Sequence, residues 1–193
     1  GEAGDGRGTY RDLFTSEDTQ GNPEVMLAYE ITAPSTGEAN WRLNSSSYGS
    51  HLCLSRIYAQ SFLNLDGTFF NEKNADGSYK TFVEETTGRD LRLNQTIRAY
   101  DYKRTDKTGK SVRTTPNFNY SLTGYHITKY TIPDEAYDVY GANNNDMPVM
   151  RYAEALLNYA EAKAELGSLT DKDWEKTIGA LRARAGITGG LKT

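Results

Sequence analysis

The residues best suited to chemistry lie in a short segment that mixes aromatic, amide and guanidinium side chains. Asn40, Trp41, Arg42 and Asn44 are followed by Tyr48. A sugar ring has apolar C–H faces and polar hydroxyl edges, so its site needs aromatic rings flanked by hydrogen-bonding groups. We therefore predict that this segment contacts a carbohydrate, with Trp41 as one aromatic platform.

One platform is too weak to hold a sugar alone. Shielding roughly 100 Å² of one ring contributes about 2.5 kcal/mol before association costs are subtracted. A millimolar complex needs about 4 kcal/mol. We therefore expect Tyr48 or Tyr29 to supply a second platform. The alternative interpretation is that Trp41 packs in the core, while Asn40 and Asn44 shape turns.

The acidic residues offer weaker candidates. Glu72, Asn74, Asp76 and Gly77 imitate the start of a calcium loop, but the twelfth position is Val83 and not the bidentate glutamate. A plain turn is the better prediction.

Three further carboxylates are of the residue type that glycosidases use, but their sequence spacing does not predict the facing geometry that such catalysis needs. Glu84, Glu85 and Asp90 could be posed for glycoside hydrolysis, yet nothing in the sequence makes them face one another. Solvated ion pairs with Arg89 and Arg92 explain them more simply.

The histidines and the cysteine predict structural roles. His51 and His126 are too isolated for a metal set or a triad, and Cys53 lies in an apolar run that favours a small buried side chain. We therefore predict no catalytic residue, no metal ligand and no cofactor, and hence a protein that is not an enzyme.

Composition excludes some partners. The 193 residues carry a net charge of −4 with pI near 5.3, whereas nucleic-acid binding needs clustered Lys and Arg. The nearest such cluster is Lys107, Lys110 and Arg113, which we predict to lie in a solvated loop. No stretch of about 20 apolar residues suggests a membrane span.

Residues 1–145 predict a loop-rich region with short elements, which we expect to face the ligand. The expected elements are a strand over 24–31, a loop over 35–50, a helix over 52–65, a turn at 74–77, a strand over 89–102 and a loop over 105–119.

Residues 146–187 predict two helices joined by a short turn. Asp146 and Pro148 suit a helix start, Gly167 suits a helix end, and Thr170 with Asp173 forms a variant of the capping box. The apolar stripe of the first helix is Val149, Tyr152, Ala153, Leu156, Leu157, Ala160 and Ala164. The stripe of the second is Trp174, Ile178 and Leu181.

Two helices cannot shield two apolar stripes by themselves. Either the irregular region covers the exposed face, or further helix pairs of a longer protein do so, as in stacked helical repeats. The predicted fold is therefore mainly α, with tetratricopeptide-like hairpins, long irregular loops and a few short strands. The chain is a single domain or a fragment of a larger one.

Several stretches together resemble the SusD/RagB family. The most specific is residues 146–162, DMPVMRYAEALLNYAEA, and the likeness continues through 181–187, LRARAGI. Three shorter stretches agree in kind and order: 22–30, 88–93 and 123–130. Family members usually have proline where Leu91 stands.

This resemblance implies an outer-membrane, cell-surface lipoprotein of Bacteroidetes-type bacteria. Such a protein binds an oligosaccharide or polysaccharide, or a nutrient such as a peptide, and delivers it to a SusC-like TonB-dependent transporter. It also implies that the sequence is partial, lacking the lipid anchor through which the protein would meet the membrane and a C-terminal segment. The alternatives are a tetratricopeptide-like protein-interaction module and, less favoured, a glycan-active hydrolase.

Overall fold

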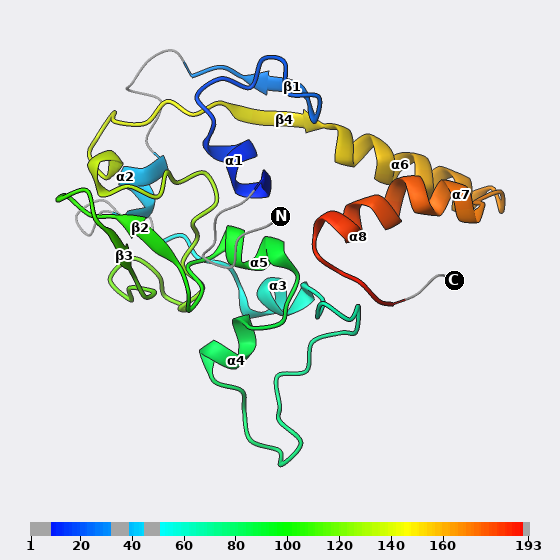
Figure 1. Cartoon of the computed structure of the whole chain (residues 1–193), viewed down its shortest axis with the longest axis horizontal. Helices are drawn as coiled ribbons and strands as arrows, with labels where there is room; N and C mark the ends of the chain where they lie inside the picture. Colours follow the sequence, from blue (N-terminus) through cyan, green and yellow to red (C-terminus); the bar gives the residue numbers. More distant parts are fainter. Residues whose placement is uncertain (1–8, 32–38, 45–50, 191–193) are drawn as a thin grey trace.

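The fold has a loop-rich body from which a helical hairpin extends (Figure 1). The computed structural model describes residues 9–31, 39–44 and 51–190. The body contains α1 (Thr9–Thr15), β1 (Val25–Tyr29), α2 (Ala39–Asn44), α3 (Arg56–Ser61), α4 (Phe82–Thr86), α5 (Leu91–Thr96), β2 (Lys103–Thr105), β3 (Ser111–Arg113) and the 3₁₀ turn η1 (Glu135–Tyr137). The rest is β4 (Met147–Arg151), α6 (Tyr152–Glu165), α7 (Asp171–Trp174), the π-helical turn η2 (Glu175–Gly179) and α8 (Ala180–Arg184). The chain is thus mainly helical with two small sheets, which confirms the predicted fold class.

Strands β1 and β4 form an antiparallel ribbon that leads into the hairpin. Val25 pairs with Arg151 and Tyr29 with Met147, with irregular register between them. The strand predicted over 24–31 is confirmed. The helix start predicted at residues 146–148 is wrong, because residues 147–151 pair with β1 and α6 begins only at Tyr152. Both strands of a two-stranded ribbon are edges, where a proline such as Pro148 is tolerated.

The hairpin follows its predicted signals after that point. Gly167 adopts a left-handed φ of 62° just beyond α6, and both hydrogen bonds of the Thr170–Asp173 capping box are present. The second helix contains a π-helical turn that the sequence did not indicate. There Gly179 allows close approach, since a Cβ at this position would lie 2.8 Å from the Trp174 ring.

Four predictions in the body need correction. Residues 39–44 form helix α2 within the expected loop, residues 91–96 form helix α5 and not a strand, the helix expected over 52–65 covers only 56–61, and β3 interrupts the expected loop over 105–119. The Asp90 side chain accepts a hydrogen bond from the Arg92 amide and so caps α5. The turn at 74–77 is confirmed by a hydrogen bond from the Gly77 amide to the Asn74 carbonyl.

The apolar core of the body is small. Ala59, Leu93, Ile97 and Tyr125 cluster between α3 and α5, and polar side chains such as Gln95 are buried around them. Buried polar groups are tolerated when hydrogen-bonded, and the Gln95 carbonyl oxygen accepts from the Arg11 amide at 2.9 Å. This hydrogen bond joins α1 to α5, beside the buried apolar side chains Leu13 and Phe14 of α1.

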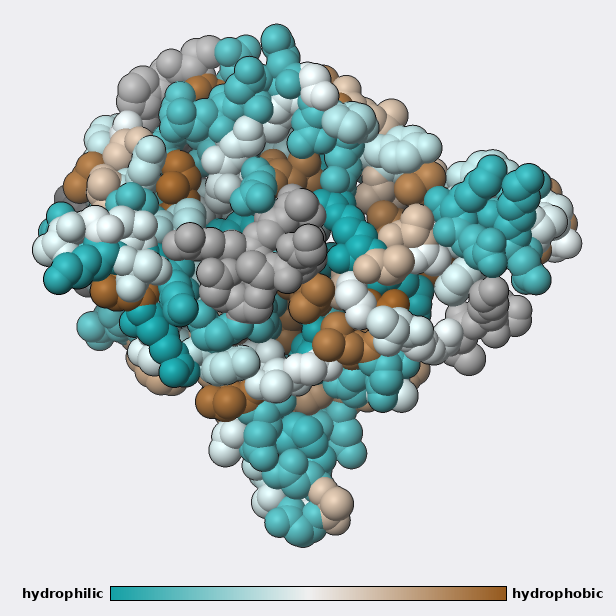
Figure 2. All heavy atoms as spheres, in the orientation of Figure 1, coloured by the Kyte–Doolittle hydropathy of each residue, from teal (hydrophilic) through white to brown (hydrophobic). Residues whose placement is uncertain are grey.

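Much apolar surface stays exposed on the ribbon and on α6, whereas the predicted stripe of the second helix, Trp174, Ile178 and Leu181, is half-buried. The exposed side chains include Met26, Leu27, Tyr29, Met147, Val149, Met150, Tyr152, Leu157, Tyr159 and Leu166. The face drawn in Figure 2 is otherwise largely hydrophilic, with separate hydrophobic patches. Among the described residues, no helix is both long and apolar enough to cross a membrane. Cys53 is half-buried and not in the core as predicted.

Candidate functional site

A cavity of about 350 Å³ lies where α2, the β2–β3 hairpin and η1 meet. Its walls combine cationic, carboxylate, amide and hydroxyl groups with an aromatic ring. The lining residues are Asn44, Arg98, Arg104, Lys107, Thr114, Asn117, Tyr120, Glu135, Asp138 and Val139. This volume is near the lower end of the range of about 300–1,000 Å³ seen for small-molecule sites. The cavity therefore has the size and polarity to take part of a hydrophilic ligand.

Two arginines form the floor of this cavity. Arg98 is 6% exposed and Arg104 is 4% exposed. Arg98 donates from Nη2 to the side-chain oxygen of Asn44 at 2.9 Å, while Arg104 pairs with Asp138 at 2.7 Å. Burial acts to lower the pKa of Arg104, but the hydrogen bond to Asp138 and the charge of that carboxylate together raise it above its ordinary value. Both guanidinium groups are thus held in fixed orientations.

The predicted amides lie at this site, and both are buried. Asn40 donates to the Ile132 carbonyl at 2.8 Å and accepts from the Ile132 amide at 2.6 Å. Asn44 donates to Asp138 at 3.1 Å. Asn44 lines the cavity, whereas Asn40 positions α2 against residues 132–138.

Trp41 lies on the same helix and meets a second ring. Its centroid is 5.4 Å from that of Tyr140 in an edge-to-face arrangement. Trp41 is partly buried and Tyr140 is 60% exposed. Tyr140 directly follows the cavity residues Asp138 and Val139 in sequence. Neither ring lines the cavity, but Trp41 shares helix α2 with Asn44 and Tyr140 is two residues from Asp138, so the aromatic pair is joined to the cavity wall through these short segments.

Two of the remaining predicted residues lie within the described ranges, and neither lines the cavity. Arg42 is exposed on α2. Tyr29 is 59% exposed on β1, which Figure 1 places apart from α2. Tyr48 lies outside the described residues.

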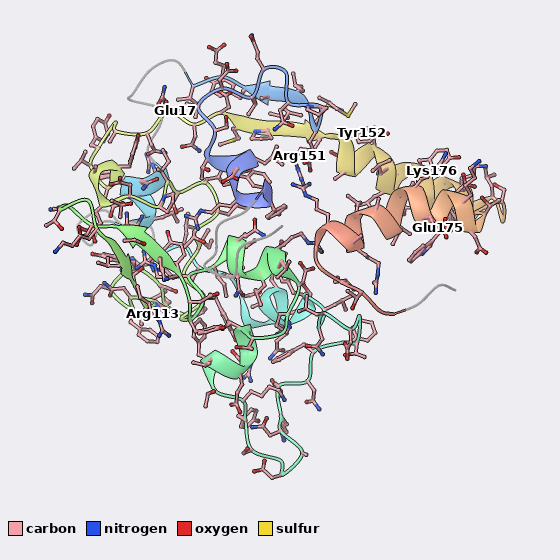
Figure 3. All side chains as sticks on the ribbon, in the orientation of Figure 1. Glu17, Arg113, Arg151, Tyr152, Glu175 and Lys176 are labelled. Carbon is pink, nitrogen blue, oxygen red and sulfur yellow. The ribbon has the colours of Figure 1, made fainter. Side chains whose placement is uncertain are left out.

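A second, more open depression of about 620 Å³ adjoins the cavity through shared residues Arg98, Thr114 and Asn117. Its other walls include Arg113 and Phe118. Figure 3 shows Arg113 at the outer edge of the body, by the β2–β3 hairpin. Phe118 is 72% exposed, so a further ring is available at this end of the groove.

The arginines create a positive field inside the body. His126 is fully buried, and its ring Nε2 donates to the Leu43 carbonyl at 3.0 Å. Burial, followed by the charge of Arg98, lowers the pKa of His126 to about 4, with a smaller contribution from Arg104. His126 is therefore a hydrogen-bonded structural histidine, as predicted, and His51 is exposed.

Sequence reasoning missed most of this site. Arg98 lies within the segment predicted as a strand, and Arg104 falls between that strand and the predicted loop. Neither was predicted as a site residue, nor were Asp138 and Tyr140. The local sequence gives no signal for them, because contacts across 34 to 54 positions bring Arg104 to Asp138 and Arg98 to Asn44. Only the α2 residues had a local signal, namely aromatic and amide composition.

The other candidate groups have structural partners. Glu84 completes a capping box on α4, and Glu85 accepts from the Tyr125 hydroxyl at 3.0 Å. Asp90 is 1% exposed and pairs with Arg92 at 2.6 Å, so the prediction of a solvated ion pair is wrong for this carboxylate. Within the described ranges, no three His, Cys, Asp or Glu side chains are grouped to hold a metal ion.

A larger cavity of about 470 Å³ lies between residues 17–21 and β1. Its walls carry the carboxylates of Glu17, Asp18, Glu30 and Asp146, and no aromatic ring is among its described lining residues. The smaller cavity beside Trp41 is therefore the better candidate for a sugar.

Comparison with known proteins is consistent with this fold. The sequence model described as the SusD family matches residues 14–192. A SusD-like protein from Bacteroides fragilis aligns at a TM-score of 0.69 with 21% identity, covering 95% of this chain and 40% of that one. A SusD-like carbohydrate binding protein from the same organism aligns at 0.67 with 22% identity, covering 96% and 38%.

At these identities the structural likeness concerns the fold. This chain spans about 40% of the length of the structures it matches. A search of curated proteins finds no match.

Proposed function

Because the chain belongs to the SusD family, we propose that it binds a carbohydrate at the bacterial cell surface and does not alter it chemically. The observation that carries this proposal is the Trp41–Tyr140 pair next to a cavity of fixed amide and guanidinium groups. Rings contact the C–H faces of a sugar, while amides and guanidiniums bind its hydroxyl groups. A similar structure carries the description carbohydrate binding, which supports the ligand class.

The second part of the proposal is delivery of the ligand to a TonB-dependent outer-membrane transporter by a lipid-anchored protein. Family membership alone supports it. Co-purification of a SusC-like transporter with the tagged protein from the native membrane is the expected result. Its absence from the purified complex would contradict this part and leave carbohydrate binding standing.

The first prediction concerns the exposed ring. Tyr140→Ala should weaken binding of a carbohydrate found by glycan-array screening about tenfold, equivalent to about 1.4 kcal/mol. The reason is that this change removes a face against which a sugar packs. Isothermal titration calorimetry with the parent and the variant measures the change.

Tyr79→Ala is the matched control, since Tyr79 is 61% exposed and lies on the distant loop before α4. Equal affinity of the parent and Tyr140→Ala would refute the assignment of this platform. Release of new reducing ends during the incubation would instead indicate a hydrolase.

A further inference from the structure

We propose that the cavity between α2, the β2–β3 hairpin and η1 binds the anionic group of an acidic carbohydrate, a uronic acid carboxylate or a sulfate ester. This inference rests on the proposed function and narrows its ligand class. It starts from an imbalance of charge. The described lining holds Arg98, Arg104 and Lys107 against Glu135 and Asp138. The cavity is therefore net positive in a chain whose net charge is −4.

The second observation is that the buried guanidinium groups have few partners. A guanidinium has five N–H donors. Arg98 uses Nη1 toward the Thr115 carbonyl at 3.3 Å and Nη2 toward Asn44. Arg104 uses Nη2 toward Asp138. Within the described part of the chain, Nε of each arginine is buried without a hydrogen-bond partner.

A third buried arginine adds to this charge. The guanidinium groups of Arg11 and Arg98 lie 5.0 and 5.4 Å from the centroid of the Tyr102 ring, and Arg11 is 1% exposed. Burial, together with the charges of Arg104 and Arg11, lowers the pKa of Arg98, whereas Arg104 is stabilised by its pairing with Asp138. A bound anion at the open side of Arg98 and Arg104 would offset this repulsion.

The geometry favours a carboxylate or sulfate on a sugar over a free small anion. Arginine forms paired, directional hydrogen bonds with planar carboxylates and with sulfate-type oxygens. The adjoining depression at Phe118 and Arg113 leaves room for a neighbouring sugar unit. An anionic group at Arg98 and Arg104 would thus place the rest of an oligosaccharide along the groove.

Matched probes test this inference. Tri-galacturonate and its methyl ester share one backbone and differ in charge, and a sulfated disaccharide of chondroitin supplies the second anion. Calorimetry with the 193-residue chain should show at least tenfold tighter binding of one anionic probe than of the ester. That preference should decline as salt rises, because ions screen charges near the surface.

Variants locate the effect without disturbing the buried arginines. Lys107→Gln should reduce the preference for the anionic probe over its neutral ester about threefold, since Lys107 is exposed at the cavity wall and the substitution removes its charge. Lys110→Gln, at the other end of the same turn and outside the cavity lining, should change neither affinity.

The outcomes separate the two proposals. Equal affinity for galacturonate and its ester, with no binding of the sulfated probe, overturns this inference while carbohydrate binding stands. An anion preference that Lys107→Gln and Lys110→Gln reduce alike assigns the charge effect to the whole surface and overturns the site. Failure to bind any neutral or acidic glycan on an array overturns both.

Discussion

At the scale of single residues, a buried arginine supplies hydrogen bonds to backbone carbonyl groups inside the small body. Arg89 is 4% exposed, and its guanidinium donates to the carbonyl oxygens of Ala59, Phe62 and Glu85. Two of these carbonyls lie near the end of α3, where helical backbone lacks internal partners. One side chain thereby closes α3 and joins it to α4. The same residue type supplies the charge of the proposed ligand site.

His126 gives the molecule a dependence on acid. Its pKa is about 4 in the folded chain and about 6.5 when unfolded. Between these two pKa values the imidazole is protonated in the unfolded state and neutral in the folded state. Stability is therefore full above pH 7 and falls as pH drops toward 4, by roughly 2–3 kcal/mol from this residue.

His126→Gln should lose much of this dependence, because the glutamine amide can still donate to the Leu43 carbonyl but does not titrate. Urea unfolding at pH 7.5 and 4.5 measures the difference. His51→Gln, at an exposed histidine, should behave like the parent. The same acid sensitivity in His126→Gln as in the parent would contradict the assignment.

At the scale of elements, the hairpin was predictable and the site was not. Gly167, Thr170 and Asp173 are local signals, and each acts within a few positions of its own helix. By contrast, residues 147–151 are extended only because β1 lies beside them. Tertiary pairing overrode the local helix signal of Pro148.

The residues of the candidate site also fall into those with a local sequence signal and those without one. Trp41 and Asn44 could be proposed from the sequence because their aromatic and amide composition is local, and they share one short helix. Alternating apolar residues between 89 and 102 suggested a strand, although Asp90 was a visible cap for the helix that forms there. Arg98 and Arg104 gain their role only from distant partners.

Two glycines in the hairpin region allow the cost of a strained backbone to be measured apart from the cost of a steric clash. Gly167 and Gly186 both adopt positive φ, 62° and 75°. A Cβ on Gly167 would meet nothing within 4 Å, whereas one on Gly186 would lie 2.7 Å from the Leu91 side chain. Gly167→Ala should cost about 1–2 kcal/mol of stability from the left-handed backbone alone.

Gly186→Ala should cost more, by roughly another 1–3 kcal/mol, because Leu91 must also move. Thermal or urea unfolding of the two variants beside the parent gives both values. If Gly186→Ala lowers the free energy of unfolding no more than Gly167→Ala does, the Leu91 side chain of α5 moves aside at no energetic cost.

At the scale of the whole molecule, one carboxylate joins the body to the hairpin. Glu24 precedes β1 and contacts Arg184 of α8, and its oxygen lies 3.7 Å from Arg151 at the end of β4. Figure 3 shows Arg151 extending into the space between α1 and α8. The Glu24 carbonyl also accepts from the Tyr152 amide at 2.9 Å. Body, ribbon and hairpin thus meet at one acidic residue.

Glu24→Gln should lower the free energy of unfolding by about 1–2 kcal/mol, because two partly buried guanidinium groups lose their shared counter-ion. Urea unfolding at low salt measures it, and added salt should reduce the difference from the parent. Glu161→Gln, at an exposed position of α6, is the control. Identical losses in the two variants would mean that Glu24 contributes only surface charge.

The β1–β4 ribbon should keep the two parts of the chain together after a peptide bond between them is cleaved. β1 pairs with β4, which lies more than 100 positions later in the sequence. Next to this ribbon, the Asp146 carboxylate accepts a hydrogen bond from the Thr19 amide at 2.9 Å, across 127 positions. A protease that cleaved the exposed turn at residues 74–77 would leave two polypeptides held together without a covalent link. Such a nicked particle should elute from a sizing column as one species, and only denaturant should release its two fragments.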